Sequence, residues 1–489
     1  MGYTMRYKVV LNTLGIILKY LGILMLIPAL VGYYYSLHDP VQFPSVMVFI
    51  YSFLVTTSVG LALQYTNSSS DEFRNRESFG IVAFAWLLAA IFGALPFLLS
   101  GMQPVDALFE SMSGFTTTGA TIMTDIESYS KALLFWRCFM QWLGGMGIIM
   151  LFLAILPKLA VAGRQLFRAE APGPTEDKLK PRLKETAKIL WMVYVVISAV
   201  EFIALLLAGM GVYDSLTHTF TTMACCGFSP RADSIAAFNS PLIEGIIVFF
   251  MFVAGANFAL HYRLIYVDHR SLLKDGEFKF YSFIVVSSTA ALTWTLWRTG
   301  MFEEIGTSFR YAIFQALSIL TTTGYATHDF NTWPDSSRMV LFMLMFIGGS
   351  AGSTAGGIKV VRLLLMLKYA YRELFRSLQP KMVRPIRLGE RVVPEDVMNS
   401  IFSFIILYIL VFMASTFILG ELGIDALSAA SASIVTLGNI GPGFDLVGPW
   451  SNFSTIPDMG KLVLIANMWI GRLEIFTVLV LLIPGFWKE

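Results

Sequence analysis

The chain has 489 residues, of which 56% are hydrophobic and only 14% are charged, and its mean hydropathy is +0.67. A soluble protein of this length needs far more charge to cover its surface, so these values exclude a soluble globular fold and predict an all-α polytopic membrane protein. The net charge of +2 gives no reason to expect nucleic-acid binding, and three cysteines, Cys138, Cys225 and Cys226, exclude a disulfide framework.

Two apolar stretches occupy residues 1–78. Leu11–Tyr35 and Val46–Gln64 are each long enough to cross a hydrocarbon core of about 30 Å. The first stretch has no small-residue cleavage site, so we interpret it as a retained span and not as a signal peptide. These two N-terminal spans precede the repeated part of the chain.

The rest of the chain follows one plan four times. Each repeat has an apolar span, a short helix-compatible segment that ends at a glycine, and a second apolar span. The repeats are predicted at residues 79–185, 186–279, 280–396 and 397–489. The predicted spans in them are Phe79–Leu99, Leu133–Leu156, Leu190–Met210, Leu242–Leu260, Phe280–Trp297, a run from Met339, Ser400–Leu419 and Leu462–Pro484. The plan predicts ten full spans and four re-entrant half-helices related by pseudo-symmetry.

The short segments end in a shared phrase. It reads Thr117-Thr118-Gly119-Ala120, Cys225-Cys226-Gly227-Phe228, Thr322-Thr323-Gly324-Tyr325 and Thr436-Leu437-Gly438-Asn439. Thirteen residues before the glycine stands an aspartate in three copies and Tyr311 in the third copy; the aspartates are Asp106, Asp214 and Asp425. Such a common offset indicates one repeated unit.

The segment between the aspartate and the glycine is too short to cross a membrane. At 1.5 Å per residue it covers roughly 15 Å, about half of the hydrocarbon core. Irregular backbone at that depth is tolerated where protein buries it or where it lines a wet cavity. Four such turns together present rings of carbonyl and threonine oxygens, which replace the hydration shell of K⁺ in K⁺ channels.

The third copy comes close to the K⁺-channel phrase Thr-Val-Gly-Tyr-Gly. We therefore predict a K⁺ site at the four turns. The predicted K⁺-binding residues are Thr117, Thr118, Gly119, Cys225, Cys226, Gly227, Thr322, Thr323, Gly324, Thr436, Leu437, Gly438 and Asn439.

Basic residues predict the orientation of the chain in the membrane. They gather in residues 158–188, 262–279 and 359–391, and all three stretches fall on one side under the ten-span count. Lys and Arg favour the cytoplasmic side. Both termini are therefore predicted in the cytoplasm, and the glycine turns near the outer face.

Each second span also carries a glycine or polar interruption beyond its turn. The interruptions are Gly144–Gly147, Gly255–Asn257, Gly348–Gly357 and Gly471–Glu474. The third is ten residues long without one large side chain, and each glycine costs a helix about 1 kcal/mol relative to alanine. We expect residues 348–357 to unwind into a loop within the membrane.

Together these features resemble the Trk/Ktr/HKT superfamily of K⁺ and Na⁺ translocating proteins. The resemblance rests on the four repeats with their glycine turns, the run from Gly348 to Lys359 and the motif Gly471-Arg472-Leu473-Glu474. It covers essentially the whole chain, and the two N-terminal spans are similar to those of the TrkH branch.

The resemblance implies K⁺ uptake across the cytoplasmic membrane through a central pore, with the loop 348–357 beneath the turns as a gate. It also implies a homodimer and a separate cytoplasmic nucleotide-binding ring of TrkA type that regulates opening. No cofactor is expected in the chain itself, and K⁺ is the transported ion. The predicted gate residues are Gly348, Gly349, Ser350, Gly352, Gly356, Gly357, Lys359 and Arg472.

This sequence departs from the pattern in two turns. Cys225 and Cys226 replace threonines in the second, and Leu437 and Asn439 stand in the fourth. The site is therefore expected to be less symmetric than that of a tetrameric channel, and permeation of Na⁺ or of both ions is the alternative.

A second alternative is a secondary transporter, a symporter that couples cation flow to H⁺ or Na⁺, because such proteins also use broken helices at mid-membrane. The glycine-rich run is no phosphate loop, since Gly357 is followed by Ile358 and not by lysine. A serine protease built on Ser350 or Ser353 with His261 lacks any supporting feature. We predict no catalytic residue and no enzyme activity.

One charged motif has two interpretations. Arg472 within a span is costly unless it faces a partner or water. It pairs either with Glu474, although residues two apart on a helix do not face each other, or with the pore lining or the loop.

Overall fold

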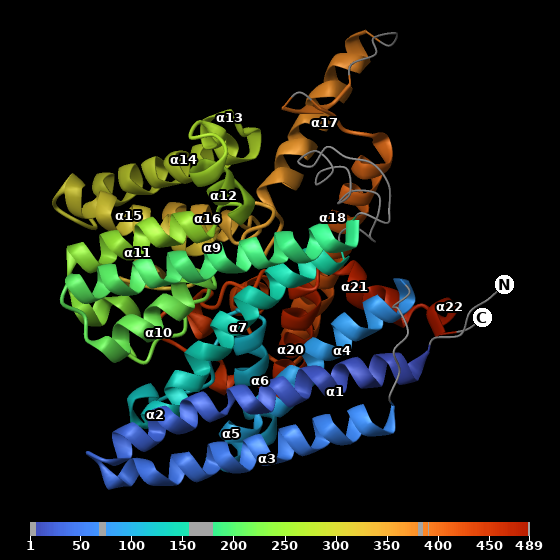
Figure 1. Ribbon diagram of the computed structural model, residues 1–489. Coiled ribbons are helices and arrows are strands. Elements are labelled where there is room, and N and C mark those ends of the chain that lie inside the picture. The colour runs from blue at the N-terminus through green and yellow to red at the C-terminus, as the bar shows by residue number, and fades with distance from the viewer. Residues whose placement is uncertain (1–5, 68–74, 156–178, 380–384, 390, 488–489) are drawn as a thin grey trace.

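The computed structural model describes residues 6–67, 75–155, 179–379, 385–389 and 391–487. Within these residues the chain is predominantly helical, apart from a small hairpin of β1 (Arg387–Leu388) and β2 (Arg391–Val392). Figure 1 shows the helices packed as one bundle, from which α17 (Val360–Leu378) projects. The predicted helical class is confirmed at this level.

The N-terminal part folds as three helices, α1 (Tyr7–Leu24), α2 (Leu26–Ser36) and α3 (Phe43–Thr66). α1 and α3 lie side by side at one edge of the bundle (Figure 1). A Cβ on Gly15 would lie only 2.7 Å from the carbonyl oxygen of Gly60. These glycines therefore let the two backbones approach closely, as small residues do between membrane helices.

Four short helices each follow a longer helical segment. The pairs are α4 and α5 (Asn75–Gly93, Leu95–Leu99) with α6 (Pro104–Phe115), α9 (Leu179–Leu207) with α10 (Val212–Met223), α14 (Gly276–Arg298) with α15 (Ile305–Leu320), and α18 (Glu395–Glu421) with α19 (Ala426–Leu437). The short helices have 12 to 16 residues. They are therefore about 18 to 24 Å long, less than the thickness of a hydrocarbon core.

Three of the four helical segments that follow are broken. α11 (Pro241–Ala254) and α12 (Phe258–Tyr266) meet at 95°, and α20 (Asp458–Arg472) meets the stretch Phe476–Leu482, which begins with α21 (Phe476–Leu479), at 110°. α16 (Asp335–Leu344) ends before a non-helical stretch that lasts until α17 begins. The breaks coincide with the glycine or polar interruptions of the sequence, and the long glycine run is a loop.

The first interruption does not break its helix, because α7 (Lys131–Ile155) runs through Gly144–Gly147 without a gap. Here the glycines serve close packing instead. A Cβ on Gly144 would lie 2.0 Å from the carbonyl oxygen of Phe115, and one on Gly145 would lie 2.8 Å from the hydroxyl of Tyr194. The expectation of an interruption in this span is corrected to a tight helix contact.

Among the described residues, six helices are long and apolar enough to cross a membrane, and the number rises to eight if each bent pair is one span. Most of the basic stretch 158–188 lies outside the described residues, as does the polar segment 68–74. The remaining elements are short: α13 (Ser271–Lys274), α22 (Pro484–Trp487), η1 (Pro40–Gln42), η2 (Ile126–Ser128), η4 (Ser234–Phe238), η5 (Phe330–Thr332), η6 (Asp445–Val447), η7 (Phe453–Thr455) and η8 (Val480–Leu482).

Candidate functional site

The four short helices α6, α10, α15 and α19 end in the same kind of backbone turn. Two residues after each helix the chain passes through the left-handed region, which is uncommon for residues other than glycine. These residues and their φ angles are Thr117 (53°), Cys225 (52°), Thr322 (57°) and Asn439 (55°). A glycine follows two positions later, at Gly119, Gly227, Gly324 and Gly441. We call residues 116–119, 224–227, 321–324 and 438–441 the glycine turns.

The fourth glycine turn lies three residues later than the sequence pattern places it. In every turn the amide after the left-handed residue donates to the carbonyl five residues back, at 2.8 to 2.9 Å; the pairs are Thr118 to Ser113, Cys226 to Thr221, Thr323 to Ser318 and Ile440 to Val435. Gly438 is thus the right-handed C-cap of α19, and Thr436 and Leu437 are among its last residues. The glycine of the fourth turn is Gly441, with φ of 109°.

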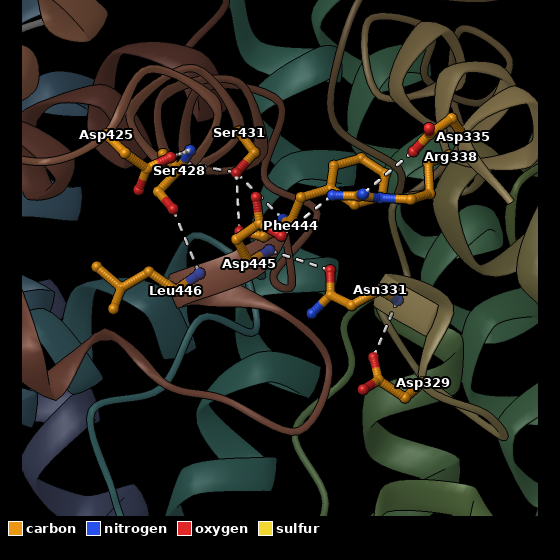
Figure 2. Close-up of polar contacts among 10 residues, drawn as sticks. All are labelled: Asp329, Asn331, Asp335, Arg338, Asp425, Ser428, Ser431, Phe444, Asp445 and Leu446. Atoms are coloured by element: carbon orange, nitrogen blue, oxygen red, sulfur yellow. Dashed lines mark hydrogen bonds and ion pairs between the residues drawn. The ribbon is translucent and has the colours of Figure 1, made fainter. Parts of the chain in front are cut away.

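The aspartates explain the displaced register. Asp106 and Asp214 lie in the first turns of α6 and α10, at the third helical position. Asp425 is instead the N-cap of α19, where its carboxylate accepts a hydrogen bond from the Ser428 amide at 3.0 Å (Figure 2). Aspartate suits both positions, as a cap and as a negative charge near the helix N-terminus, and they are three residues apart. The shared offset of thirteen residues from aspartate to glycine therefore matched an N-cap in the fourth copy with a third helical position in the first and second copies.

The glycine turns close into a ring. A Cβ on Gly119 would lie 3.0 Å from the nitrogen of Gly227, and one on Gly227 would lie 2.5 Å from the carbonyl oxygen of Thr323. A Cβ on Gly324 would lie 2.0 Å from the carbonyl oxygen of Ile440. The ring closes where a Cβ on Gly441 would lie 2.9 Å from the carbonyl oxygen of Thr118. Each turn therefore contacts the next, and glycine is required because the adjacent backbone leaves no room for a side chain.

All four glycines of these turns line one open cavity, which Gly438 does not line. The side chains of the turns are also polar and hydrogen-bond to one another. Thr116 and Thr118 share a hydroxyl hydrogen bond of 2.8 Å, and Asn439 Nδ2 donates to Thr118 Oγ1 at 2.9 Å. Thr117 Oγ1 and Asn439 Oδ1 are buried and have no hydrogen-bond partner among the described residues. Buried oxygen atoms of this kind are available to an ion or to water.

The glycine-rich loop between α16 and α17 lies directly against this ring. The amide of Gly356 donates to Thr322 Oγ1 at 2.7 Å, and Thr354 Oγ1 lies 3.1 Å from Cys225 Sγ. A Cβ on Gly356 would lie 3.0 Å from the Cβ of Asn439. The loop thus contacts the left-handed residue of the second, third and fourth turns.

Arg472 holds the loop from the fourth repeat. Its Nη1 donates to the carbonyl oxygen of Thr354 at 2.9 Å, and its Nη2 donates to the carbonyl oxygen of Gly144 at 3.3 Å. The side chain is 2% exposed. Gly144 packs against Phe115 at the end of α6, so the guanidinium also connects the loop to the helix that precedes the first glycine turn. The contact with the loop agrees with one of the two interpretations of Arg472.

The other interpretation, a pair with Glu474, is not what the structure has. Glu474 instead forms an ion pair with Arg362 at the start of α17. Lys359 Nζ donates to the carbonyl oxygen of Ala355 within the loop. The first contact ties the start of α17 to the residues after α20, and the second lies within the loop itself.

The structure therefore brings the predicted residues of the first three turns together with the loop residues, Lys359 and Arg472. Of the fourth set, Gly438 and Asn439 lie in the glycine turn, whereas Thr436 and Leu437 lie in α19. Sequence reasoning missed Gly441 and the carbonyl of Gly144. The signal for Gly441 was present, because Gly441-Pro442-Gly443 offers a turn just beyond the helix.

Comparisons with known proteins agree with this arrangement. The family model of the TrkH cation transport proteins matches residues 45–488. The Trk system potassium uptake proteins TrkH and TrkG of Escherichia coli are 39% and 33% identical over 493 and 492 residues, and the alignments cover 99% of this chain and 100% of each relative. The crystal structure of the potassium transporter TrkH from Vibrio parahaemolyticus superposes with a TM-score of 0.91 at 37% identity, covering 99% of this chain and 100% of that one.

Apolar helices around a ring of backbone turns define a multi-pass membrane protein of the ion-transport class. With a family model matched over residues 45–488, this chain belongs to the TrkH family of cation transport proteins. The family model and the named relatives are those of transport proteins.

Proposed function

We propose that this protein takes up K⁺ across the cytoplasmic membrane through the ring of glycine turns, which acts as the selectivity filter. The main support for this proposal is that the four turns contact one another through backbone atoms, so that no side chain fits between them. Such a ring offers carbonyl and hydroxyl oxygens to a dehydrated cation, which is how K⁺ filters replace the hydration shell. The printed names of the relatives, potassium uptake proteins, support the same ion.

The loop beneath the ring is proposed as the gate. Its contacts with Cys225, Thr322 and Asn439 support this proposal, because a loop held against three of the turns would obstruct an ion that leaves the filter. Arg472 adds a positive charge at the same place, which opposes the passage of a cation while the loop is held. The gate residues are those predicted from the sequence, with Thr354 added.

The finer topology belongs to the same proposal. We assign ten full spans and four re-entrant half-helices, with both termini in the cytoplasm and the filter near the outer face. Two chains form a homodimer, and a separate nucleotide-binding ring of TrkA type acts on the loop through α17. This helix supports the assignment because it continues directly from the loop and projects from the bundle (Figure 1).

Permeation of Na⁺ together with K⁺ is the second candidate, and the asymmetry of the ring favours it. Cys226 and Ile440 occupy the positions at which the first and third turns carry Thr118 and Thr323, so two hydroxyls are absent there. Fewer oxygens at one level of a filter weaken its preference for the ion that needs them. Coupling to H⁺ or Na⁺ stays the third candidate.

The test is cation uptake by the purified full-length protein in liposomes, with K⁺ and Na⁺ compared in both directions of an imposed gradient. We expect K⁺ to be preferred and flow to follow its gradient. Expression in a bacterium without its own K⁺ uptake systems is expected to restore growth at low K⁺ when the regulatory partner is supplied. Equal or greater Na⁺ uptake would favour the second candidate, and K⁺ accumulation against its gradient that needs a Na⁺ or H⁺ gradient would favour the third.

The register of the fourth turn gives a separate prediction. Gly441→Ala is expected to lower the K⁺ preference over Na⁺, because φ is 109° and the new Cβ meets the carbonyl oxygen of Thr118. Gly438→Ala is the control, since its φ of −79° suits any residue and the atoms nearest to a Cβ there belong to Ile434, Ile440 and Met345 and not to another glycine turn. Uptake of both ions by the two variants in liposomes checks this. An equal loss of preference in both variants, or a loss in Gly438→Ala alone, would contradict the register.

A further inference from the structure

The chain that leaves each glycine turn is tied back to its own short helix. Nine residues before the glycine, the first three repeats carry Glu110, His218 and Gln315, which are at most 1% exposed. Glu110 Oε2 accepts from the amide of Ile122 at 3.0 Å, and His218 Nε2 lies 3.1 Å from Ser229 Oγ. Gln315 Nε2 donates to the carbonyl oxygen of Tyr325 at 3.4 Å. One helix position thus holds the segment after the filter in three repeats.

The fourth repeat uses a serine for the same purpose. Ser431 Oγ accepts from the amide of Phe444 at 3.1 Å, as Figure 2 shows. The segment is also tied to the third repeat, since the amide of Asp445 donates to Asn331 Oδ1 at 3.0 Å and Arg338 Nη2 lies 3.1 Å from Asp445 Oδ1. The side chains of Arg338 and Asp445 are 22% and 43% exposed, so this ion pair is in contact with solvent.

The first repeat differs because its tie is a buried ion pair. Arg137 Nε of α7 lies 2.5 Å from Glu110 Oε1, and the two side chains are 1% and 0% exposed. The carboxylate also accepts from Thr121 Oγ1 at 3.0 and 3.1 Å. Every oxygen of Glu110 is therefore occupied, and the charge is fixed in one position next to the first turn.

Arg137 carries the tie across to the second repeat. Its Nη1 donates to the carbonyl oxygen of Ser229 at 2.9 Å, and its guanidinium carbon lies 3.7 Å above the ring of Phe228. Phe228 and Ser229 directly follow the glycine of the second turn. One buried charge pair thus connects the segments that leave the first and second turns, whose glycines are themselves neighbours in the ring.

We infer that the Glu110–Arg137 pair is a positioning element for ion selectivity, which fixes the spacing of the carbonyls of the first two filter turns. The inference rests on the proposed function. A buried pair of charges is costly to form and gives little net stability against an apolar replacement, but it has one sharply defined geometry because each hydrogen bond has a direction. It suits a task in which small displacements of carbonyl oxygens matter more than stability. The second turn needs this support because cysteines stand where the first and third turns carry threonines.

The test compares K⁺ and Na⁺ uptake by the full-length protein in liposomes for wild type, Glu110→Gln and the double variant Glu110→Gln/Arg137→Gln. We expect the ratio of K⁺ to Na⁺ uptake to fall about tenfold in both variants, which is the effect of a misplacement well below 1 Å at a reacting centre. Glu244→Gln/Arg310→Gln is the matched control. It removes a two-bond ion pair between α11 and α15, with distances of 2.6 Å, and within the described part of the chain these two side chains hydrogen-bond to each other and not to a glycine turn.

The outcomes distinguish a failure of the proposed function from a failure of the inference about the Glu110–Arg137 pair. Wild-type protein that takes up no K⁺ even with its regulatory partner supplied overturns the proposed function. A selective wild type with an unchanged ratio in the folded double variant overturns this inference alone, and so does an equal loss in the control. If Glu110→Gln and the double variant do not fold, Arg137→Lys is tested instead. This variant keeps the buried positive charge and removes the second donor, the one that reaches Ser229. A wild-type ratio in that variant likewise overturns the inference, and a lowered ratio with unchanged thermal unfolding supports it.

Discussion

Replacing Gly324 by serine is expected to abolish the K⁺ preference of the pore. The residue has φ of 78°, and a Cβ there would lie 2.0 Å from the carbonyl oxygen of Ile440 and 2.9 Å from Pro442 Cδ. Backbone atoms cannot swing away as a flexible side chain does, so the third and fourth turns must separate. The ratio of K⁺ to Na⁺ uptake in liposomes should fall by at least about tenfold, to a value near that of an unselective pore.

Gly300→Ser separates this effect from backbone strain. Gly300 precedes α15 of the same repeat and has a similar φ of 70°, but a Cβ there would meet nothing within 4 Å. Both variants carry the left-handed strain of a residue other than glycine, about 1 to 2 kcal/mol. We expect the thermal unfolding of both to shift and the ion preference of Gly300→Ser to stay at the wild-type value. A wild-type ratio in a folded Gly324→Ser protein would remove the third turn from the filter.

The sequence predicts the first three turns in the register that the structure has, because their signals are local. A glycine that closes a turn just after a short helix leaves a pattern within about fifteen residues. The predicted position of the fourth turn was three residues too early. The reason is that Asp425 caps its helix, whereas Asp106 and Asp214 lie in the first turn of their helices. A pattern of residue types does not distinguish these two positions, although the backbone geometry does so at once.

Glycine clusters within spans carry a similar ambiguity. Those at Gly255 and Gly471 stand at breaks in their helical segments, whereas the cluster at Gly144 keeps its helix intact. All three glycines approach the end of a short helix or its turn: a Cβ on Gly144, Gly255 or Gly471 would lie within 2.6 Å of Phe115, Thr321 or Leu437. Close approach is the common requirement, whether or not the helix breaks at the glycine.

The sequence does not identify which residues form ion pairs with each other when they lie far apart in the chain. Glu474 takes its partner from 112 residues away, at Arg362, and Arg137 of α7 pairs with Glu110 of α6, 27 residues earlier. Charges within spans predict that some partner exists, since an unpaired charge in hydrocarbon is costly. The identity of that partner depends on which helices are neighbours, which only the packed bundle shows.

Removing the guanidinium of Arg472 is expected to open the pore without a regulator. Its two hydrogen bonds hold the carbonyl oxygens of Thr354 and Gly144, and a hydrogen bond to a charged group contributes about 1.5 to 3 kcal/mol. Each 1.4 kcal/mol lost from the closed state raises the open population about tenfold. Arg472→Ala should therefore raise K⁺ uptake by liposomes about tenfold or more while the ratio of K⁺ to Na⁺ changes little, because the filter turns themselves are intact.

Two further variants test the loop itself. Deleting Gly349 to Ala355 removes Thr354, which contacts both Cys225 and Arg472, so it should raise flux at least as much as Arg472→Ala. Thr354→Val removes the hydroxyl that donates to the carbonyl oxygen of Met223 at 2.9 Å but leaves the carbonyl that Arg472 binds. Its effect should be smaller, on the order of a single neutral hydrogen bond of about 1 kcal/mol.

Lys461→Ala is the control for the loss of a buried cation from the same helix. Lys461 Nζ lies 2.6 Å from Asp106 Oδ1, its side chain is 6% exposed, and it precedes Arg472 by eleven residues, roughly 16 Å along α20. This variant should lower the thermal stability and leave the flux without a regulator at the wild-type level. If the deletion and Arg472→Ala both fold and show wild-type flux, the loop is a packing feature and the gate lies elsewhere. If Lys461→Ala raises the flux as much as Arg472→Ala, the effect comes from a loosened bundle and not from a released loop.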